Sequence, residues 1–83
     1  MNNSSRKRLV AARLRYLRDV AGLTQRQVSD LTGIHEVTYS GYELGRACPC
    51  AEALVRLADI YQVSLDVLLC RFEQPQKGSI DNL

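Results

Sequence analysis

Apolar residues recur at helical spacing along much of the chain. The first such stripe consists of Val10, Leu14, Leu17 and Ala21. These positions follow i, i+4, i+7 and i+11, which predicts a helix over about residues 6–21. Later stripes predict helices over about 50–61 and 65–71, the last of them held to the core by Leu65, Leu68 and Leu69. No segment shows the alternation of a half-buried strand, and no internal repeat is visible.

Two shorter helical patterns lie on either side of Gly33. Thr24 is a good N-cap for a helix over about 25–32, and Gln27 three residues later completes a capping box. A tight turn requires the positive φ that glycine adopts readily, and a second helix over about 36–43 then follows. The sequence therefore predicts an all-α fold of five short helices.

The two short helices have recognisable candidates for the core and for the caps. The side chains expected to face the core are Val28, Leu31, Tyr39 and Tyr42, with Val37 as a further candidate. His35 stands at the N-cap position of the second helix, although histidine is a weak capping residue. The whole pattern divides the chain into a basic, partly mobile arm at 1–8, a helix-turn-helix domain at 9–72 and a flexible tail at 73–83.

Charge is unevenly distributed over the 83 residues, although the formal net charge is only +2. Residues 1–34 carry seven Lys/Arg and two acids, a net charge of +5, whereas residues 35–83 carry four Lys/Arg and seven acids, a net charge of −3. This asymmetry is typical of a protein with one surface that binds a polyanion, and it equally fits a basic helix face exposed to solvent.

Several classes of protein are disfavoured. The apolar runs are far shorter than the ~20 residues that span a bilayer, and the polar N-terminus has no signal-peptide pattern, so we expect a cytoplasmic protein without a membrane partner. An odd number of cysteines, Cys48, Cys50 and Cys70, argues against a disulfide framework. We expect no cofactor and no small-molecule ligand.

Between residues 13 and 69 the chain has an ordered set of residues at a characteristic spacing: Arg13-Leu14-Arg15, Leu17-Arg18, Gly22-Leu23-Thr24-Gln25, Val28, Leu31-Thr32-Gly33-Ile34, Thr38, Ser40, Tyr42-Glu43, Gly45-Arg46, Pro49, Leu54, Leu57-Ala58 and Val63-Ser64-Leu65-Asp66. With this set, residues 13–69 resemble the phage repressor/Cro (XRE) family of helix-turn-helix transcriptional regulators. The resemblance lies in the ordered set at this spacing, since each piece alone is common. It implies a compact five-helix, lambda-repressor-like DNA-binding domain.

The same resemblance implies a repressor-like regulator that binds specific double-stranded DNA, commonly as a homodimer. The helix over 36–43 would lie in the major groove. The residues that we expect to contact DNA are Thr24, Gln25, Arg26, His35, Glu36, Val37, Thr38, Ser40, Gly41 and Arg46. Arg18 and Glu43 match a family pair that forms a structural ion pair between the first helix and the end of the helix over 36–43.

The expected recognition helix has an unusual composition, because residues 35–43 include no Lys, Arg, Gln or Asn. Those side chains make the usual specific contacts with guanine and adenine. Here Glu36 can accept from a cytosine amino group, Val37 can touch a thymine methyl group, and Thr38 and Ser40 can bond bases or phosphates. Two alternatives stay open: recognition of DNA shape together with the basic residues 6–8, or a protein-interaction, antitoxin-like co-regulator module on the same scaffold.

The remaining reactive residues do not form a catalytic or metal-binding pattern. Cys48-Pro49-Cys50 does not have the usual zinc spacing and no second pair follows, so we expect reduced cysteines, with a redox sensor as the alternative. His35 is the only histidine and has no nucleophile beside it in the sequence, so we expect no enzyme activity. Leu69, Cys70 and Phe72 suggest an apolar dimer patch near the last helix, or else a helix end that faces the core.

Overall fold

The computed structural model describes residues 3–71, with side chains from residue 5 onward. Within this range the chain forms five α-helices and no strand. The helices are α1 (Asn3–Ala21), α2 (Gln25–Thr32), α3 (Glu36–Glu43), α4 (Ala51–Tyr61) and α5 (Leu65–Leu68). The predicted all-α fold of five helices is therefore confirmed, while the tail expected at 73–83 lies outside the described residues.

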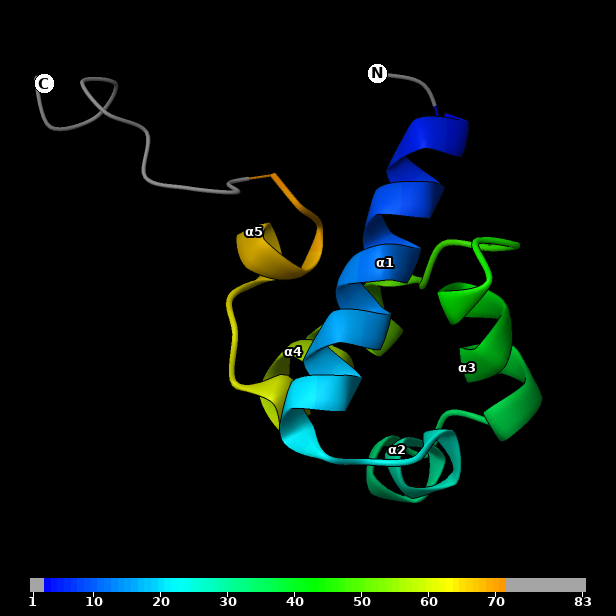
Figure 1. The fold of residues 1–83 in the computed structure, drawn as a ribbon, viewed down its shortest axis with the longest axis vertical. Coiled ribbons are helices and arrows are strands. Elements are labelled where there is room, and N and C mark those ends of the chain that lie inside the picture. The colour runs from blue at the N-terminus through cyan, green and yellow to red at the C-terminus, as the bar shows by residue number, and fades with distance from the viewer. Residues whose placement is uncertain (1–2, 72–83) are drawn as a thin grey trace, which may run out of the picture.

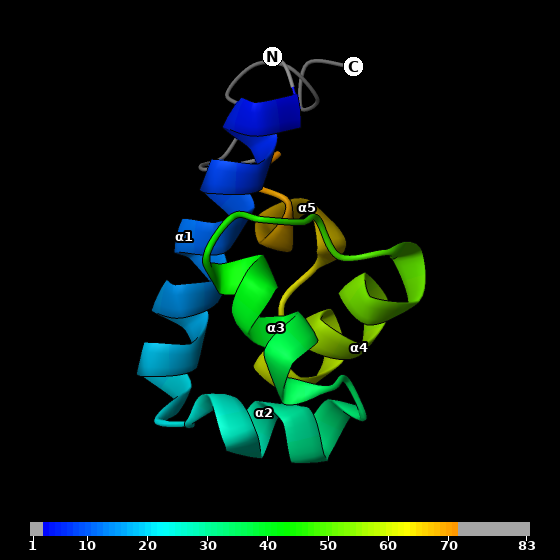
Figure 2. The same ribbon diagram turned by 90° about the vertical axis from the view of Figure 1, so that its right-hand side faces the viewer.

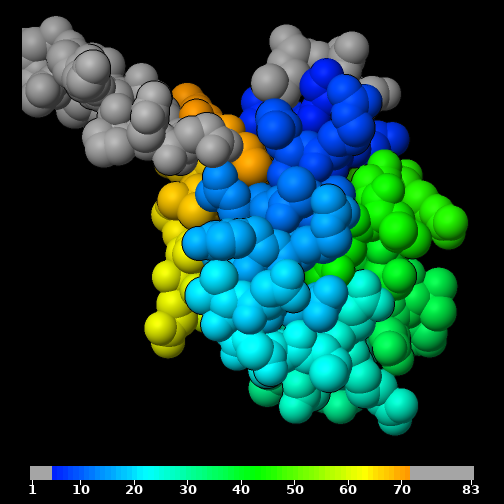
Figure 3. Space-filling view, in the orientation of Figure 1, coloured from blue at the N-terminus to red at the C-terminus, as the bar shows by residue number. Residues whose placement is uncertain are grey.

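The helices are arranged around α1, which runs along the long axis of the molecule. Figure 1 shows α3 on one side of α1, α5 on the other, and α2 crossing beneath. When the molecule is turned by 90°, α3 faces the viewer, α2 lies below it and the chain after α3 passes above it (Figure 2). In the space-filling view, α1 crosses the front from top to bottom, and α3 forms the right-hand edge (Figure 3).

Every helix contributes one apolar side chain with no exposed surface to a single core. These residues are Leu14, Val28, Tyr39, Leu57 and Leu68, one from each helix in chain order. Burial of such a side chain is worth roughly 1.5–3 kcal/mol, so this shared cluster holds even the four-residue α5 in place.

The first helix begins earlier than the sequence pattern predicts. Helix α1 starts at Asn3 and not near residue 6, so residues 3–8 of the expected N-terminal arm belong to the helix. Basic side chains at a helix N-terminus oppose the helix dipole. Here the Arg6 guanidinium donates to the Leu69 carbonyl oxygen at 2.6 Å, and Arg13 donates to Val67 O at 2.8 Å, so contacts with α5 offset that cost.

One side chain of the short helices lies on a different face from the one predicted. Leu31 was expected to be buried, but it is 60% exposed, and Thr32 takes the inner position four residues after Val28. The Thr32 hydroxyl donates to Val28 O at 2.7 Å, which removes the cost of burying it. Val37, a candidate both for the core and for DNA contact, is exposed, because the inner face of α3 is formed by Tyr39, Tyr42 and Glu43.

The last helix is shorter than predicted. Helix α5 ends at Leu68 and not at residue 71, and Cys70 adopts a left-handed φ of 61°. Leu65 is half exposed, so Leu68 alone is fully buried. The Cys70 thiol faces inward and donates to Leu9 O at 3.4 Å, so Cys70 is not available for the expected dimer patch. Phe72, the other residue expected there, lies outside the described residues.

Candidate nucleic-acid interface

The turn between α2 and α3 is held by local hydrogen bonds that the sequence encodes. The capping box forms in both directions: Gln27 N donates to Thr24 Oγ1 at 3.0 Å and Thr24 N donates to Gln27 Oε1 at 2.8 Å. Gly33 closes α2 with a φ of 78°, and its N–H donates to Ser29 O. His35 caps α3 by accepting from Val37 N through Nδ1. These contacts fix where α3 begins relative to α2.

Glu43, at the end of α3, is the centre of a buried polar cluster. Its side chain is only 2% exposed, and it accepts from Arg18 Nε at 2.7 Å and from Arg18 Nη2 at 3.0 Å. Gln25 Nε2 donates to the same carboxylate at 3.0 Å. The ion pair that the family resemblance implied thus joins α1 to α3, and the amide of Gln25 adds α2 to it.

A second hydroxyl pair extends this cluster to α4. The hydroxyl groups of Tyr39 and Tyr61 lie 2.8 Å apart, and Tyr39 also hydrogen-bonds with Glu43. An ionised carboxylate only accepts, so the single Tyr39 proton goes to Glu43, and Tyr61 donates to Tyr39. The chain of contacts Arg18–Glu43–Tyr39–Tyr61 therefore links α1, α3 and α4. We call it, together with Gln25, the inner cluster.

The protonation states of the inner cluster follow from these contacts. Burial alone would raise the pKa of Glu43, but hydrogen bonds from Arg18, Tyr39 and Gln25 lower it below its ordinary value. The hydrogen bond to Glu43 raises the pKa of Arg18. Burial raises the pKa of Tyr39, and its hydrogen bonds raise it further. The ion pair is thus charged, and both tyrosines are neutral, around neutral pH.

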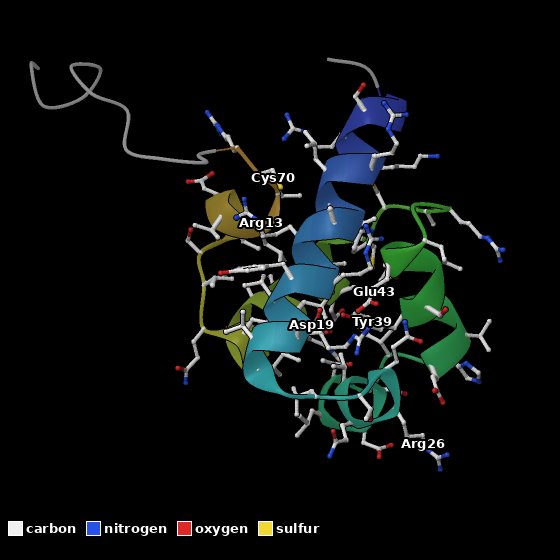
Figure 4. The ribbon with its side chains drawn as sticks, viewed as in Figure 1. Arg13, Asp19, Arg26, Tyr39, Glu43 and Cys70 are labelled. Atoms are coloured by element: carbon white, nitrogen blue, oxygen red, sulfur yellow. The ribbon has the colours of Figure 1, made fainter. Side chains whose placement is uncertain are left out.

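The opposite face of α3 is open to solvent. Val37 is 74% exposed and Leu44, the C-cap residue, is 59% exposed, while Thr38 is exposed and Gly41 is partly exposed. In Figure 4, Tyr39 and Glu43 lie between α1 and α3, whereas Arg26 points away from the molecule at the foot of α2. The ridge that a helix-turn-helix must present is therefore available.

The predicted DNA contacts fall into three groups. Thr24, Arg26, His35, Val37, Thr38 and Arg46 are exposed, and Glu36, Ser40 and Gly41 are partly exposed. Gln25 is also partly exposed, but its amide is already bonded to Glu43, which gives it a structural role that the sequence did not reveal. The exposed group comes from the start of α2, from α3 and from the loop after α3, which adjoin one another in Figure 2.

One structural residue was missed at the sequence level. Arg15 donates through Nη1 to the Glu43 carbonyl oxygen at 2.5 Å, so α1 holds both the side chain and the backbone of Glu43. Arg15 stands three residues before Arg18, on a neighbouring part of the same helix face, and that spacing was the available signal.

The cysteines do not assemble into a site. Cys48 and Cys50 are exposed and Cys70 is buried. Across residues 3–71, no group of three or more His, Cys, Asp or Glu side chains is placed to hold a metal ion. Cys50 occupies the N-cap position of α4 but makes no capping hydrogen bond through its side chain. No helix in the described part of the chain is long and apolar enough to cross a membrane.

Comparison with known proteins decides the family. A family model described as a helix-turn-helix domain matches residues 9–69, which is more than half of the chain. This chain belongs to the helix-turn-helix family of the phage repressor/Cro type. Its match covers α2, the Gly33 turn and α3, together with most of α1 and all of α4 and α5.

Three named relatives support this assignment. The chain is 42% identical over 64 residues to the HTH-type transcriptional regulator AnsR of Bacillus subtilis, a match that covers 77% of this chain and 55% of AnsR. It is 36% identical over 63 residues to the cryptic phage CTXphi transcriptional repressor RstR of Vibrio cholerae, covering 76% and 56% of the two chains. The HTH-type transcriptional regulator ImmR of Bacillus subtilis is 34% identical over 71 residues, with 86% and 56% covered.

The matches cover only part of each relative. The chain spans little more than half the length of the relatives just named, so they share this domain and not their whole length with it. No solved structure matches the helix-turn-helix chain significantly. None of the three relatives is named as an enzyme.

Proposed function

We propose that this protein binds double-stranded DNA as a transcriptional regulator, with α3 in the major groove. The observation that carries the proposal is the exposed outer face of α3, which lies between the start of α2 and the loop that follows α3 (Figure 2). A major groove about 12 Å wide admits one α-helix, so a helix that protrudes in this way can reach base edges.

Charge supports the same orientation. Arg26, in the first turn of α2, and Arg46, in the loop after α3, are both exposed. In Figure 2 these two segments of the chain lie below and above α3. Two arginines flanking a protruding helix suit the two phosphate backbones that border a groove, and Arg is the side chain best shaped for phosphate. The backbone N–H groups at the start of α2 offer a further phosphate contact.

The relatives suggest the biological role. RstR is named as a phage transcriptional repressor, and AnsR and ImmR are named as transcriptional regulators. We propose a repressor-like role in the cytoplasm, without catalysis, for the present chain. A homodimer fits this role because paired half-sites are read by two copies of α3, each half-site about one helical turn from the other.

The direct test is selection of bound sequences from random 30-base-pair duplexes, followed by titration of the best duplex at two salt concentrations. We expect an enriched sequence with two related half-sites and an affinity that falls steeply as salt rises, because phosphate contacts release counterions. Failure to bind any duplex at low salt would overturn the proposal.

Charge variants locate the binding face. Arg26→Ala and Arg46→Ala should each weaken binding to all sequences and lower the salt slope by about one. Arg71→Ala is the matched control, because it also removes one positive charge from an exposed residue, but that residue follows α5, the helix on the other side of α1 from α3 in Figure 1. Equal losses in all three variants would mean that DNA contacts the protein without this orientation.

A further inference from the structure

One solvent-facing line of residues on α3 has no polar side chain. Val37, Gly41 and Leu44 stand at i, i+4 and i+7, so they share one face of the helix, opposite the buried Tyr39 and Glu43. We call these three residues the outer ridge. None of their side chains carries a nitrogen or oxygen atom, and the two large ones are 74% and 59% exposed.

The outer ridge cannot read bases in the usual way. Guanine presents two acceptors in the major groove and calls for a donor such as Arg or Lys, and adenine calls for Asn or Gln. The helix has none of these four residue types. Its polar groups near the ridge are the hydroxyls of Thr38 and Ser40 and the carboxylate of Glu36, and a carboxylate is repelled by guanine acceptors and by phosphates.

Thymine offers the chemistry that fits this ridge. Its C5-methyl group is the one apolar group that a base presents on the major-groove edge, and contact with it removes apolar surface from water on both partners. Val37 and Leu44 supply three-carbon and four-carbon branched surfaces for such contacts. Glu36 adds an acceptor for the amino group of cytosine or adenine.

Gly41 also supports a close approach of the outer ridge to DNA, because the fold itself does not require a glycine there. A Cβ built at Gly41 would meet no atom within 4 Å, and the residue has ordinary helical backbone, unlike Gly33 with its φ of 78°. A helix interior without a side chain at its most outward point allows the backbone to approach a surface closely. This arrangement lets Val37 and Leu44 reach the groove floor on either side of it.

We propose that the outer ridge recognises thymine methyl groups, so that the half-site is defined by thymines at fixed positions and not by guanine. This inference rests on the proposed DNA binding. The flanking Arg26 and Arg46 favour a polyanion on this face over an apolar protein partner, because a polyanion neutralises both charges.

The test replaces thymine by uracil, which differs only in lacking the methyl group. The probe is the duplex selected from the random library, with uracil placed at one thymine at a time, first within the half-sites and then in the flanks. We expect about a fourfold loss of affinity at one or more half-site positions, the worth of one buried methyl group, and no change in the flanks. A cytosine at a sensitive position should bind better when it carries the C5-methyl group.

A variant of Val37 tests whether the outer ridge causes the loss of affinity on replacing thymine by uracil. Val37→Ala removes two methyl carbons, so it should weaken binding to the thymine duplex by up to about fifteenfold, and it should abolish the difference between thymine and uracil at one position. Val20→Ala is the matched control, since Val20 is 67% exposed on α1 and should change neither value.

The outcomes separate the two proposals. Tight binding to the selected duplex with no uracil effect at any position would overturn methyl recognition and leave DNA binding intact. A uracil effect that persists unchanged in both Val37→Ala and Leu44→Ala would also overturn it, because another part of the protein would then read the methyl group. No binding to any duplex would overturn both proposals and favour a protein partner for the ridge.

Discussion

Each face of α3 includes residues of a kind that a surface helix usually keeps on its other face. Its inner face buries an ionised Glu43, and its outer face exposes Val37 and Leu44. The inner charge is tolerated because Arg18, Gln25 and Tyr39 all bond it, and no buried polar side-chain atom in the described residues lacks a hydrogen-bond partner. The outer apolar residues contribute nothing comparable to the fold.

This difference separates what builds the domain from what it offers to a ligand. The inner cluster fixes α3 against α1, α2 and α4, so it sets the angle at which the outer ridge is presented. Substitutions on the inner face should therefore act on folding, and substitutions on the outer ridge should act on binding. Each prediction below tests one side of that division.

Removal of the Glu43 carboxylate should have the largest effect. Glu43→Ala leaves Arg18 and Tyr39 without their shared partner, and loss of one member of a buried ion pair costs about 3–5 kcal/mol, somewhat less here because the Arg18 side chain is 20% exposed. Urea unfolding followed by circular dichroism measures the change. Glu52→Ala breaks the exposed pair with Arg56 and should cost less than about 1 kcal/mol. Equal losses in the two variants would contradict the central role of Glu43.

Acidification should reproduce part of the stability loss of Glu43→Ala without a mutation. Because the pKa of Glu43 is lower in the folded protein than its ordinary value of 4.5, its contribution to stability is complete above that value and is lost as the pH falls through the lowered pKa. Thermal unfolding between pH 7 and pH 2 should show the decline. Glu43→Gln should be less stable at pH 7 but should lose less on acidification, and parallel curves for the two proteins would contradict this.

The Tyr39–Tyr61 pair should have a smaller effect. Tyr61→Phe removes one hydroxyl and one hydrogen bond, but Tyr39 keeps its bond to Glu43, so we expect a loss of about 1 kcal/mol. Tyr16→Phe is the control, since Tyr16 is 62% exposed on α1. If unfolding free energies show no difference between the two variants, α4 does not belong to the inner cluster.

Local signals made much of the fold predictable. Thr24 and Gln27 form the capping box, and Gly33 has the positive φ that its turn requires. Each of these depends on residues within a few positions of one another. The bounds of α2 and α3 were predicted from the same signals.

Which face of a two-turn helix points to the core was not predictable. In α2, Leu31 and Thr32 are both compatible with an inward position next to Val28, and apolarity favoured Leu31. The structure buries Thr32 because its hydroxyl bonds Val28 O and its carbonyl accepts from Arg56, which lies on α4. A contact 24 residues away in the chain leaves no local signal. The same reason hides the bond from Gln25 to Glu43, so the site residues on α2 were harder to assign than those on α3.

The smallest predicted change in stability is also the one of opposite sign. Gly41→Ala should stabilise the protein by about 0.5–1 kcal/mol, because alanine favours the helix and its Cβ meets no other atom. Gly33→Ala is the matched control and should destabilise the protein, because its φ is 78° and the new Cβ would lie 3.1 Å from Arg56 Nη1.

The same Gly41→Ala variant should bind the selected duplex more weakly, since the added methyl group stands where the helix backbone approaches the groove. Stability and affinity then move in opposite directions, which loss of folding cannot explain. Unfolding free energy and fluorescence anisotropy on one preparation measure both. A variant that is more stable and binds equally well would show that the outer ridge does not approach DNA closely, and the glycine would then have no function in recognition.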